Sequence, residues 1–216
     1  LLLDEAGIKD GVTIRIRKYI PVAAGMAGGS TDAAAVLVGV NRMFDLGFTK
    51  KELMERGVKL GADVPYCVMR GTALSEGIGE ILTELPPSPK CHLVIAKPQI
   101  SVSTKAVYGK LRVNELAPEE HPDIDGMIRA LSAGDLDGVA ARLCNVFEEF
   151  LPEEYHEVFH IKNRLLELGA LNAAMSGSGP TVFGIFREKT AAKAAETALK
   201  QCYPQTYLAK PVGELV

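Results

Sequence analysis

Several common signals of function are missing from this sequence. No apolar run approaches the ~20 residues of a transmembrane helix. The 24 basic residues are mixed with 27 acidic ones and form no basic block, so the net charge of −3 argues against broad binding to nucleic acids or membranes. The four cysteines are far apart and form no C-x-x-C pair, which argues against zinc knuckles and redox motifs. A cytoplasmic protein with reduced thiols is the expectation.

The composition and the order of elements favour a soluble α+β protein. The chain has 216 residues, of which 47% are hydrophobic and 24% charged. Alternating residues predict a strand over 12–16, and helices are predicted over 30–44 and from Thr49 to Gly61. A strand is predicted over 66–74, followed by a proline-rich stretch over 82–90. This stretch predicts two domains, residues 1–90 and residues 91–216.

The second predicted domain also mixes strands and helices. Strands are predicted over 92–96, 170–175, 181–186 and 206–209. Helices are predicted from Ser103 or Thr104 to Leu111 and over 123–133, 135–149, 154–168 and 189–200. Since the two types do not alternate strictly, α+β is favoured over a doubly wound sheet.

A glycine-rich stretch between the first strand and the first helix is the most informative motif. It reads Pro-Val-Ala-Ala-Gly-Met-Ala-Gly-Gly-Ser-Thr-Asp from Pro21 to Asp32. Glycines allow tight turns and close approach to a ligand, and a helix N-terminus attracts phosphate. No Lys follows the glycines, so the stretch is not a P-loop, and its spacing is not that of a dinucleotide fingerprint. A turn that packs a helix on a sheet explains the same residues.

Two more segments carry candidate chemistry. Asp63 lies in Leu-Gly-Ala-Asp-Val-Pro, just past a predicted helix end, where a carboxylate serves either the turn or an acceptor hydroxyl. Residues 71–80 are glycine-rich and favour a hairpin bend, whereas a bare turn and a ligand-binding turn explain the glycine-rich residues 175–183 equally well.

Taken in order, these motifs resemble those of the GHMP small-molecule kinases. The loop fits P-x-x-x-G-x-[GA]-G-[GS]-S, and it is followed by Gly-Ala-Asp-Val-Pro, Gly-x-Ala-x-x-x-Gly-x-Gly-Glu and Met-Ser-Gly-Ser-Gly. The middle two are similar to the branch that phosphorylates the 2-hydroxyl of a cytidine-diphosphate-linked polyol in non-mevalonate isoprenoid synthesis. The resemblance implies an incomplete ribosomal S5 domain 2-like N-terminal domain and a ferredoxin-like C-terminal domain. It also implies ATP and Mg²⁺ as cofactors and a monomer or homodimer.

The resemblance assigns expected roles to individual residues. Asp63 matches the catalytic aspartate, which also contacts the substrate. The other substrate-binding residues implied are Thr104, Tyr108, Ser176, Gly177, Ser178 and Gly179. The ATP-binding residues implied are Pro21, Ala24, Gly25, Met26, Ala27, Gly28, Gly29, Ser30 and Thr31. No direct metal ligand is implied. The family often has Phe where Tyr108 stands, and Tyr keeps the stacking face.

The sequence departs from the family at its start. The Pro-x-Lys-x-Asn and Gly-Tyr-His motifs, which supply the catalytic Lys and much of the adenine pocket, have no match here. The chain also lacks an initiator Met, and an acidic pair directly follows its first three leucines, so no signal peptide is expected. An N-terminally truncated kinase without turnover of its own is therefore expected.

Other functions are weighed against the kinase. Another GHMP kinase, such as a homoserine or mevalonate kinase, would share the first and last motifs, and an inactive binding fragment would share all of them. A zinc protease is suggested by His156-Glu-Val-Phe-His160, which fits H-E-x-x-H literally. Both histidines, however, are expected on the polar face of an amphipathic helix, and no third ligand stands out.

Overall fold

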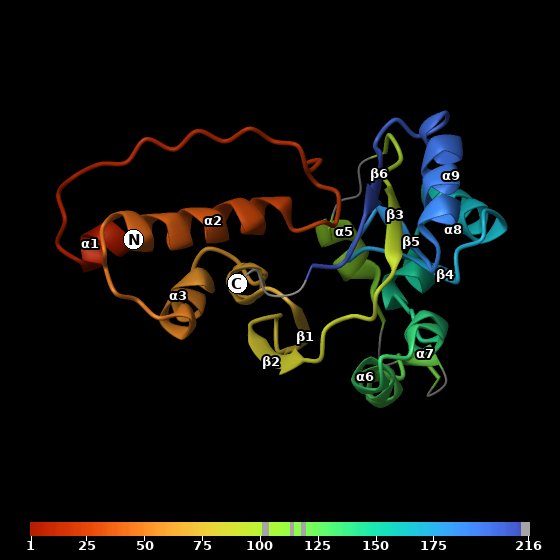
Figure 1. The fold of residues 1–216 in the computed structure, drawn as a ribbon, viewed down its shortest axis with the longest axis horizontal. Coiled ribbons are helices and arrows are strands. Elements are labelled where there is room, and N and C mark those ends of the chain that lie inside the picture. The colour runs from red at the N-terminus through yellow and green to blue at the C-terminus, as the bar shows by residue number, and fades with distance from the viewer. Residues whose placement is uncertain (101–103, 113–114, 118–119, 213–216) are drawn as a thin grey trace. The chain divides into compact units, whose positions relative to one another are not determined.

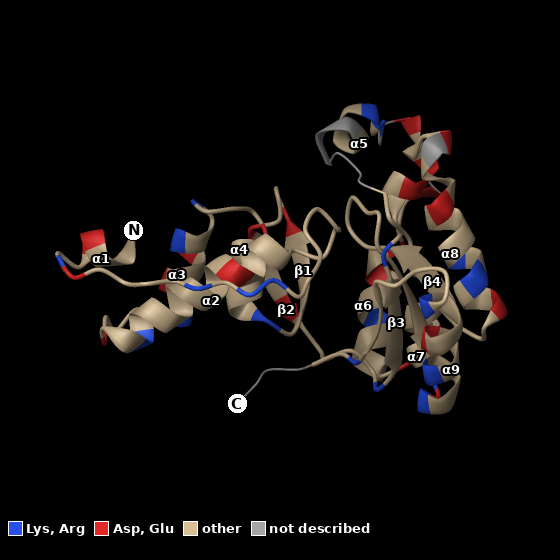
Figure 2. Cartoon of the chain, turned by 90° about the horizontal axis from the view of Figure 1, so that it is seen from above, with Lys and Arg blue, Asp and Glu red and all other residues tan. Residues whose placement is uncertain are grey.

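The computed structural model describes residues 1–100, 104–112, 115–117 and 120–212. These residues group into two units, each with its own contacts. The first comprises residues 1–22 and 27–85, and the second comprises residues 23–26 and 86–212. Figure 2 shows acidic and basic residues interleaved along the helices rather than gathered into one block. None of the described helices is long and apolar enough to cross a membrane.

The first unit consists of four helices and a hairpin. Its helices are α1 (Leu2–Glu5), α2 (Gly28–Met43), α3 (Lys50–Gly57) and α4 (Val64–Met69), and β1 (Thr72–Glu76) pairs antiparallel with β2 (Ile81–Leu85). The buried residues of α2, α3 and α4 share one apolar cluster around Leu37, Leu53 and Val68. The predicted capping box is confirmed, because the Thr49 hydroxyl accepts from the Glu52 amide and the Glu52 carboxylate accepts from the Thr49 amide.

The second unit is built on an antiparallel sheet of order β4-β5-β3-β6. Its strands are β3 (His92–Ala96), β4 (Asn172–Met175), β5 (Val182–Phe186) and β6 (Thr206–Ala209). Its helices are α5 (Thr104–Lys110), α6 (Ile124–Ala133), α7 (Leu136–Ala141), α8 (His156–Glu167) and α9 (Lys189–Lys200), with 3₁₀ turns η3 (Val146–Phe150) and η4 (Glu153–Tyr155) (Figure 1).

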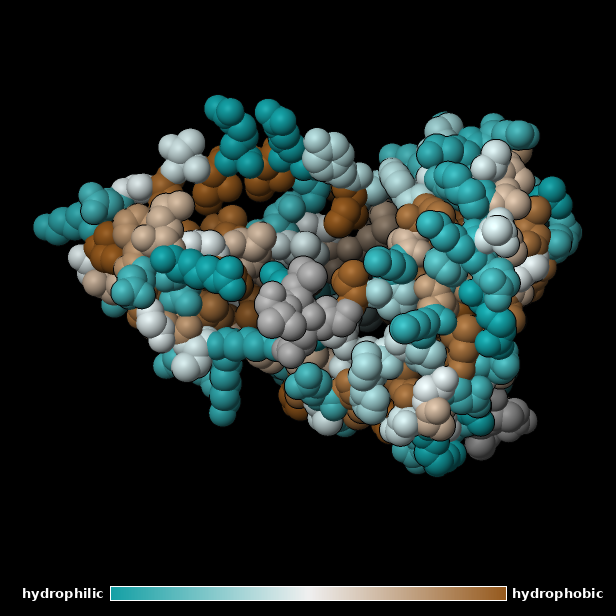
Figure 3. Space-filling view, in the orientation of Figure 1, coloured by the Kyte–Doolittle hydropathy of each residue, from teal (hydrophilic) through white to brown (hydrophobic). Residues whose placement is uncertain are grey.

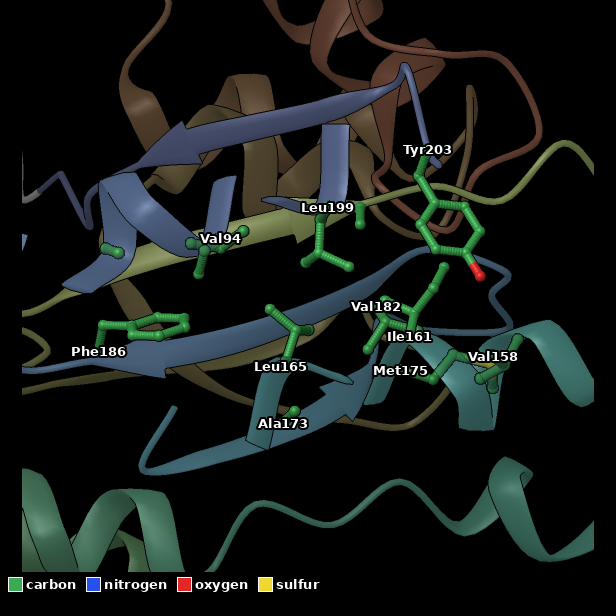
Figure 4. Packing of buried hydrophobic residues seen from close by; sticks show 13 residues of the cluster. Val94, Val158, Ile161, Leu165, Ala173, Met175, Val182, Phe186, Leu199 and Tyr203 are labelled. Carbon is green, nitrogen blue, oxygen red and sulfur yellow. The ribbon is translucent and has the colours of Figure 1, made fainter. Parts of the chain in front are cut away.

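Helices α8 and α9 cover the sheet and bury its apolar residues. Val182 and Phe186 lie four residues apart on β5 and are both fully buried, as alternation along a strand requires. Ile161 and Leu165 of α8 meet them in the same cluster, together with Leu199 of α9 (Figure 4). The mixture of helix and strand confirms the predicted α+β class. The strands predicted over 92–96 and 206–209 are also confirmed, as β3 and β6.

Two predicted strands are wrong. Residues 12–16 form no strand, because no described residue pairs with their backbone, and Ile14 and Ile16 are each 54% exposed. Their alternation still gives the segment one apolar side, which together with α2 lines a cavity of about 630 Å³ (Figure 3). The first half of the strand predicted over 66–74 is helix α4. Pro65 fits the first turn of that helix, and a short buried apolar run does not distinguish helix from strand.

Two predicted helices end earlier than expected. The helix that begins after Thr49 ends at Gly57 rather than Gly61, and a turn follows it. The helix predicted over 135–149 is α7, which ends at Ala141, followed by the separate turn η3. The side chain of Asn145 explains this break, because it accepts from the Phe147 amide and starts η3 as a cap.

The buried hydroxyl of Thr181 allows a test of what an unpaired polar group costs in the core. Thr181 is fully buried, and its Oγ1 has no hydrogen-bond partner among the described residues. Because a buried unpaired hydroxyl costs about 1–3 kcal/mol, Thr181→Val is expected to raise the free energy of unfolding by about 1 kcal/mol in urea titrations. Thr206→Val is the matched control. Thr206 is equally buried, but its hydroxyl donates to the Tyr203 carbonyl at 2.6 Å, so the loss of this hydrogen bond is expected to destabilise the protein. Equal effects of the two variants would contradict this account.

Candidate active site

The N-terminus of α2 presents amide groups with no side-chain cap. The helix begins at Gly28, and its N-cap, Ala27, has a left-handed φ of 47° and makes no side-chain cap hydrogen bond. The first helical bond joins the Thr31 amide to the Ala27 carbonyl at 2.9 Å. A Cβ added to Gly29 would meet no atom within 4 Å, because Gly29 lines the apolar cavity between residues 12–16 and α2. The positive end of a 16-residue helix with uncapped amides suits an anion.

A lysine from the preceding segment lies against the same turn. Lys18 Nζ pairs with the Asp32 carboxylate at 2.5 Å, and it lies 3.3 Å from the position that a Cβ on Gly28 would take. The same Cβ would lie 3.0 Å from the Ile20 side chain, so only glycine fits at position 28 without a shift. Lys18 therefore places an ammonium beside the helix N-terminus and neutralises the Asp32 carboxylate there. Lys18 could not be predicted from the sequence, because nothing in its spacing relates it to Asp32.

The carboxylate of Asp63 is exposed and unused by the fold. Asp63 is the N-cap of α4, yet its side chain makes no cap hydrogen bond and no ion pair with a described residue. The turn-stabilising role considered for this aspartate would require such a bond. The carboxylate is thus available to a ligand.

Cys67 connects Asp63 to the start of α2 within the first unit. Its Sγ lies 3.6 Å from the Thr31 hydroxyl, and its amide donates to the Asp63 carbonyl at 3.1 Å. Burial raises the pKa of the Cys67 thiol, and the Asp63 charge raises it further, while the Thr31 hydrogen bond lowers it. The candidate catalytic carboxylate and a candidate ATP-binding hydroxyl therefore border the same thiol. The sequence carried no signal for this contact, because the two segments lie 36 residues apart.

In the second unit, the segment 23–26 is tied to the loop between β4 and β5. Ser176 Oγ donates to the Gly25 carbonyl at 2.8 Å, and a Cβ on Gly25 would lie 2.2 Å from the Ser176 carbonyl. The structure thus brings Gly25 together with Ser176 and Gly179, as one site requires. Of the other residues assigned to ATP, Ala24 is buried, while Pro21 and Met26 are half-buried. Ser178 lies in the same loop, between Gly177 and Gly179.

Asn145 and Glu148 hold the loop between β4 and β5 through hydrogen bonds to its backbone. Asn145 Nδ2 donates to the carbonyls of Met175 and Gly177, both at 2.8 Å. The buried Glu148 accepts from the Met175 amide at 2.7 Å and pairs with Lys162. These positioning residues were absent from the sequence analysis, because polar residues in a predicted helix gave no sign of a distant partner.

Tyr108 is an exposed residue of α5 rather than a core residue. Its side chain is 59% exposed, and its ring meets the Phe147 ring edge-on at 4.8 Å between centroids. Phe147 belongs to η3, the turn that Asn145 caps, so Tyr108 is connected through η3 to the loop at Ser176. Thr104 begins α5 one helical turn earlier, and its side chain lies outside the described part of the chain.

The two histidines of the H-E-x-x-H match have different surroundings. His160 Nδ1 lies 2.7 Å from the Tyr203 hydroxyl, which donates to Glu157 at 2.5 Å. Burial and the Glu157 charge raise the pKa of Tyr203 well above its usual range. The side chain of His156 is 71% exposed. Among the described residues, no group of three His, Cys, Asp or Glu side chains is placed to hold a metal.

The matches to family models define the class of protein. Residues 1–71 match the GHMP kinases N-terminal domain, and residues 127–205 match the GHMP kinases C-terminal domain. Among solved structures, a 4-(cytidine 5'-diphospho)-2C-methyl-D-erythritol kinase is similar over 98% of this chain and 75% of its own, with a TM-score of 0.83 and 29% identity. A homoserine kinase from Cytophaga hutchinsonii shares the fold at a TM-score of 0.78 and 20% identity.

Curated relatives narrow the class further. The 4-diphosphocytidyl-2-C-methyl-D-erythritol kinase of Lachnospira eligens is 51% identical over 93% of this chain and 69% of its own. The kinase of the same name from Lachnoclostridium phytofermentans is 53% identical over 90% of this chain and 66% of its own. The chain therefore belongs to the 4-diphosphocytidyl-2-C-methyl-D-erythritol kinase family of GHMP kinases.

Two glycines of the loop give a matched pair of variants. Gly25→Ala is expected to lower the free energy of unfolding by more than about 2 kcal/mol, because its Cβ would collide with the Ser176 backbone at a φ of 70°. Gly29→Ala is expected to be neutral or to gain up to about 1 kcal/mol, since its Cβ would enter open space in a helix. Urea unfolding monitored by circular dichroism measures both. A neutral Gly25→Ala would mean that the loop is not held against Ser176.

Proposed function

We propose that this chain serves the ATP-dependent phosphorylation of the 2-hydroxyl of 4-diphosphocytidyl-2-C-methyl-D-erythritol, in non-mevalonate isoprenoid synthesis. The observation that carries this proposal is the 51–53% identity to relatives named for this substrate. The structures of homoserine and mevalonate kinases share the fold at 20% identity or less, so they give no argument for their own substrates. The geometry at α2 and Asp63 supports the same reaction class.

The N-terminus of α2 is suited to the ATP phosphates. The uncapped amides of its first turn offer donors, and the ammonium of Lys18, paired with Asp32, lies beside Gly28. Mg²⁺, when bound with the nucleotide, supplies further neutralisation of the triphosphate. Ser30 and Thr31 offer hydroxyls on the same turn. Thr31 donates to the Ala27 carbonyl, so the Cys67 thiol 3.6 Å away would donate to the Thr31 oxygen, which leaves one lone pair for a ligand.

Asp63 is proposed as the catalytic carboxylate. Phosphoryl transfer needs positioning and charge neutralisation more than covalent chemistry. An ordinary carboxylate is too weak a base to ionise an alcohol beforehand, so Asp63 would orient the acceptor hydroxyl and take its proton late, as the new P–O bond forms. Its exposure and its lack of protein partners among the described residues support this role.

The cytidine end of the substrate is proposed to lie against Tyr108. An exposed aromatic ring held edge-on by Phe147 keeps one face available for stacking. Thr104 and the loop of Ser176, Gly177, Ser178 and Gly179 complete the proposed substrate-binding residues. Asn145 would act through them by fixing the loop carbonyls.

The role of Asp63 is tested in enzyme that shows phosphoryl transfer. Asp63→Asn is expected to lower kcat by about 10²–10⁴-fold and to leave ATP affinity nearly unchanged, because the amide keeps the shape and loses the base. Steady-state kinetics and calorimetry with ATP measure the two effects. Asp125→Asn is the control, since Asp125 is an exposed residue in the first turn of α6. Retention of most of the wild-type kcat by Asp63→Asn would remove Asp63 from the mechanism.

Tyr108 provides the test of substrate recognition. Since stacking is worth roughly 1–3 kcal/mol per base, Tyr108→Ala is expected to lower the affinity for the cytidine substrate by about 5- to 150-fold. Tyr108→Phe is expected to be nearly silent, because the ring face is kept. ATP affinity should change little with either variant. Equal weakening of ATP and the cytidine substrate would instead assign Tyr108 to support of the fold.

A further inference from the structure

A second hollow of the first unit is lined by positive charge. Its volume is about 360 Å³, and it lies where the end of α2, the start of α3 and the end of α4 meet. Arg42, Lys50 and Arg70 contribute cationic side chains to its lining, and Val38, Phe48 and Leu53 contribute apolar ones. No acidic residue is among the described residues that line it. We call this hollow the Arg70 pocket.

Two of the three cations have no charge partner. Arg42 and Arg70 form no ion pair and no side-chain hydrogen bond with a described residue, whereas Arg56 of the neighbouring helix pairs with Glu5 and stacks on Phe48. Guanidinium groups are planar forks that match phosphate oxygens in pairs. Two such groups at one hollow, without internal partners, are the chemistry of an anion site.

The backbone of Arg70 is a second, independent observation. Arg70 follows the last residue of α4 with φ 64° and ψ −176°, a conformation that is essentially restricted to glycine. The next residue is Gly71, which also has a positive φ. An arginine at position 70 therefore costs stability that a glycine would not. Residues with backbone strain of this kind cluster at active sites and ligand-binding sites.

We propose that the Arg70 pocket binds a small phosphate ester, with the guanidinium groups of Arg42 and Arg70 on the phosphate and the apolar wall against the ester group. The volume is at the lower end for small-molecule sites, and the basic residues form a hollow rather than a stripe that would follow a nucleic-acid backbone. Arg70 lies past the C-terminal end of α4, and Asp63 occupies the N-cap position at its other end. At 1.5 Å per residue, the six residues between them separate the two positions by roughly 10 Å along the helix.

The probe is phenyl phosphate, compared with inorganic phosphate at equal ionic strength, in calorimetric titrations of the full chain without nucleotide. Phenyl phosphate is expected to bind several-fold tighter than phosphate, because the apolar wall contacts the ring. Arg42→Gln, which leaves the backbone unchanged, is expected to lower the affinity for phenyl phosphate by about tenfold. Arg17→Gln, an exposed arginine outside the pocket, is the control and should change nothing. Gly28→Val, which disturbs the turn at α2, should leave this binding intact.

Arg70→Gly separates binding from structure. It is expected to raise the melting temperature, because the backbone strain is relieved. It is also expected to lower the affinity for phenyl phosphate by about tenfold or more. Arg70→Lys keeps the charge and should retain part of the affinity. A higher melting temperature with unchanged affinity would overturn the proposal, as would loss of binding in Gly28→Val with retention in Arg70→Gly. Because the test uses neither ATP nor turnover, it stands whether or not the proposed kinase function holds.

Discussion

One hydrogen bond holds together two motifs that lie 151 residues apart. Ser176 Oγ donates to the Gly25 carbonyl, and it does so from a loop that Asn145 and Glu148 fix on the other side. Glycine at position 25 is a steric requirement of this contact, since a Cβ would overlap the Ser176 carbonyl. The beginning of the glycine-rich stretch is therefore anchored by tertiary structure and not by its own turn. The chemistry proposed for the stretch depends on that anchor.

Two alanines of the stretch adopt left-handed conformations. Ala23 has a φ of 52° and Ala27 a φ of 47°, values that cost energy for any residue with a Cβ. The strain persists because the flanking groups fix it, Ser176 at Gly25 and the Thr31 amide at the Ala27 carbonyl. In return, α2 starts with amides that no side chain caps. A glycine at position 27 would relieve the strain of the turn. An Asp or Ser there would accept hydrogen bonds from the amides of the first turn with its own side chain, so these amides would no longer be available to a ligand.

The sequence predicted helices and strands well where a local signal decides them. The Thr49 capping box, the amphipathic α8 and the apolar β3 all formed as expected. The strand over 12–16 failed because a strand depends on a neighbour, which no window of sequence shows. The helix at Val64 was missed because tertiary burial, more than propensity, decides a six-residue apolar run. Boundaries such as Ala141 moved because Asn145 caps a new turn.

The candidate site divides in the same way. Gly25, Gly28 and Asp63 could be proposed from motifs, because a motif indicates which residues are expected to lie close to a ligand. Lys18, Cys67 and Asn145 were missed, since each acts through a partner 14 to 36 residues away that only the fold reveals.

Lys18 shows why such partners matter for the chemistry. Asp32 lies in the first two turns of α2, where its negative charge favours the helix but would repel a triphosphate at the same end. Lys18 neutralises that charge at 2.5 Å and leaves its own ammonium beside Gly28. The pair is one-third exposed, so water weakens its contribution to stability. Its main effect is therefore on the local potential, because it neutralises Asp32 near the turn that we propose for the ATP phosphates.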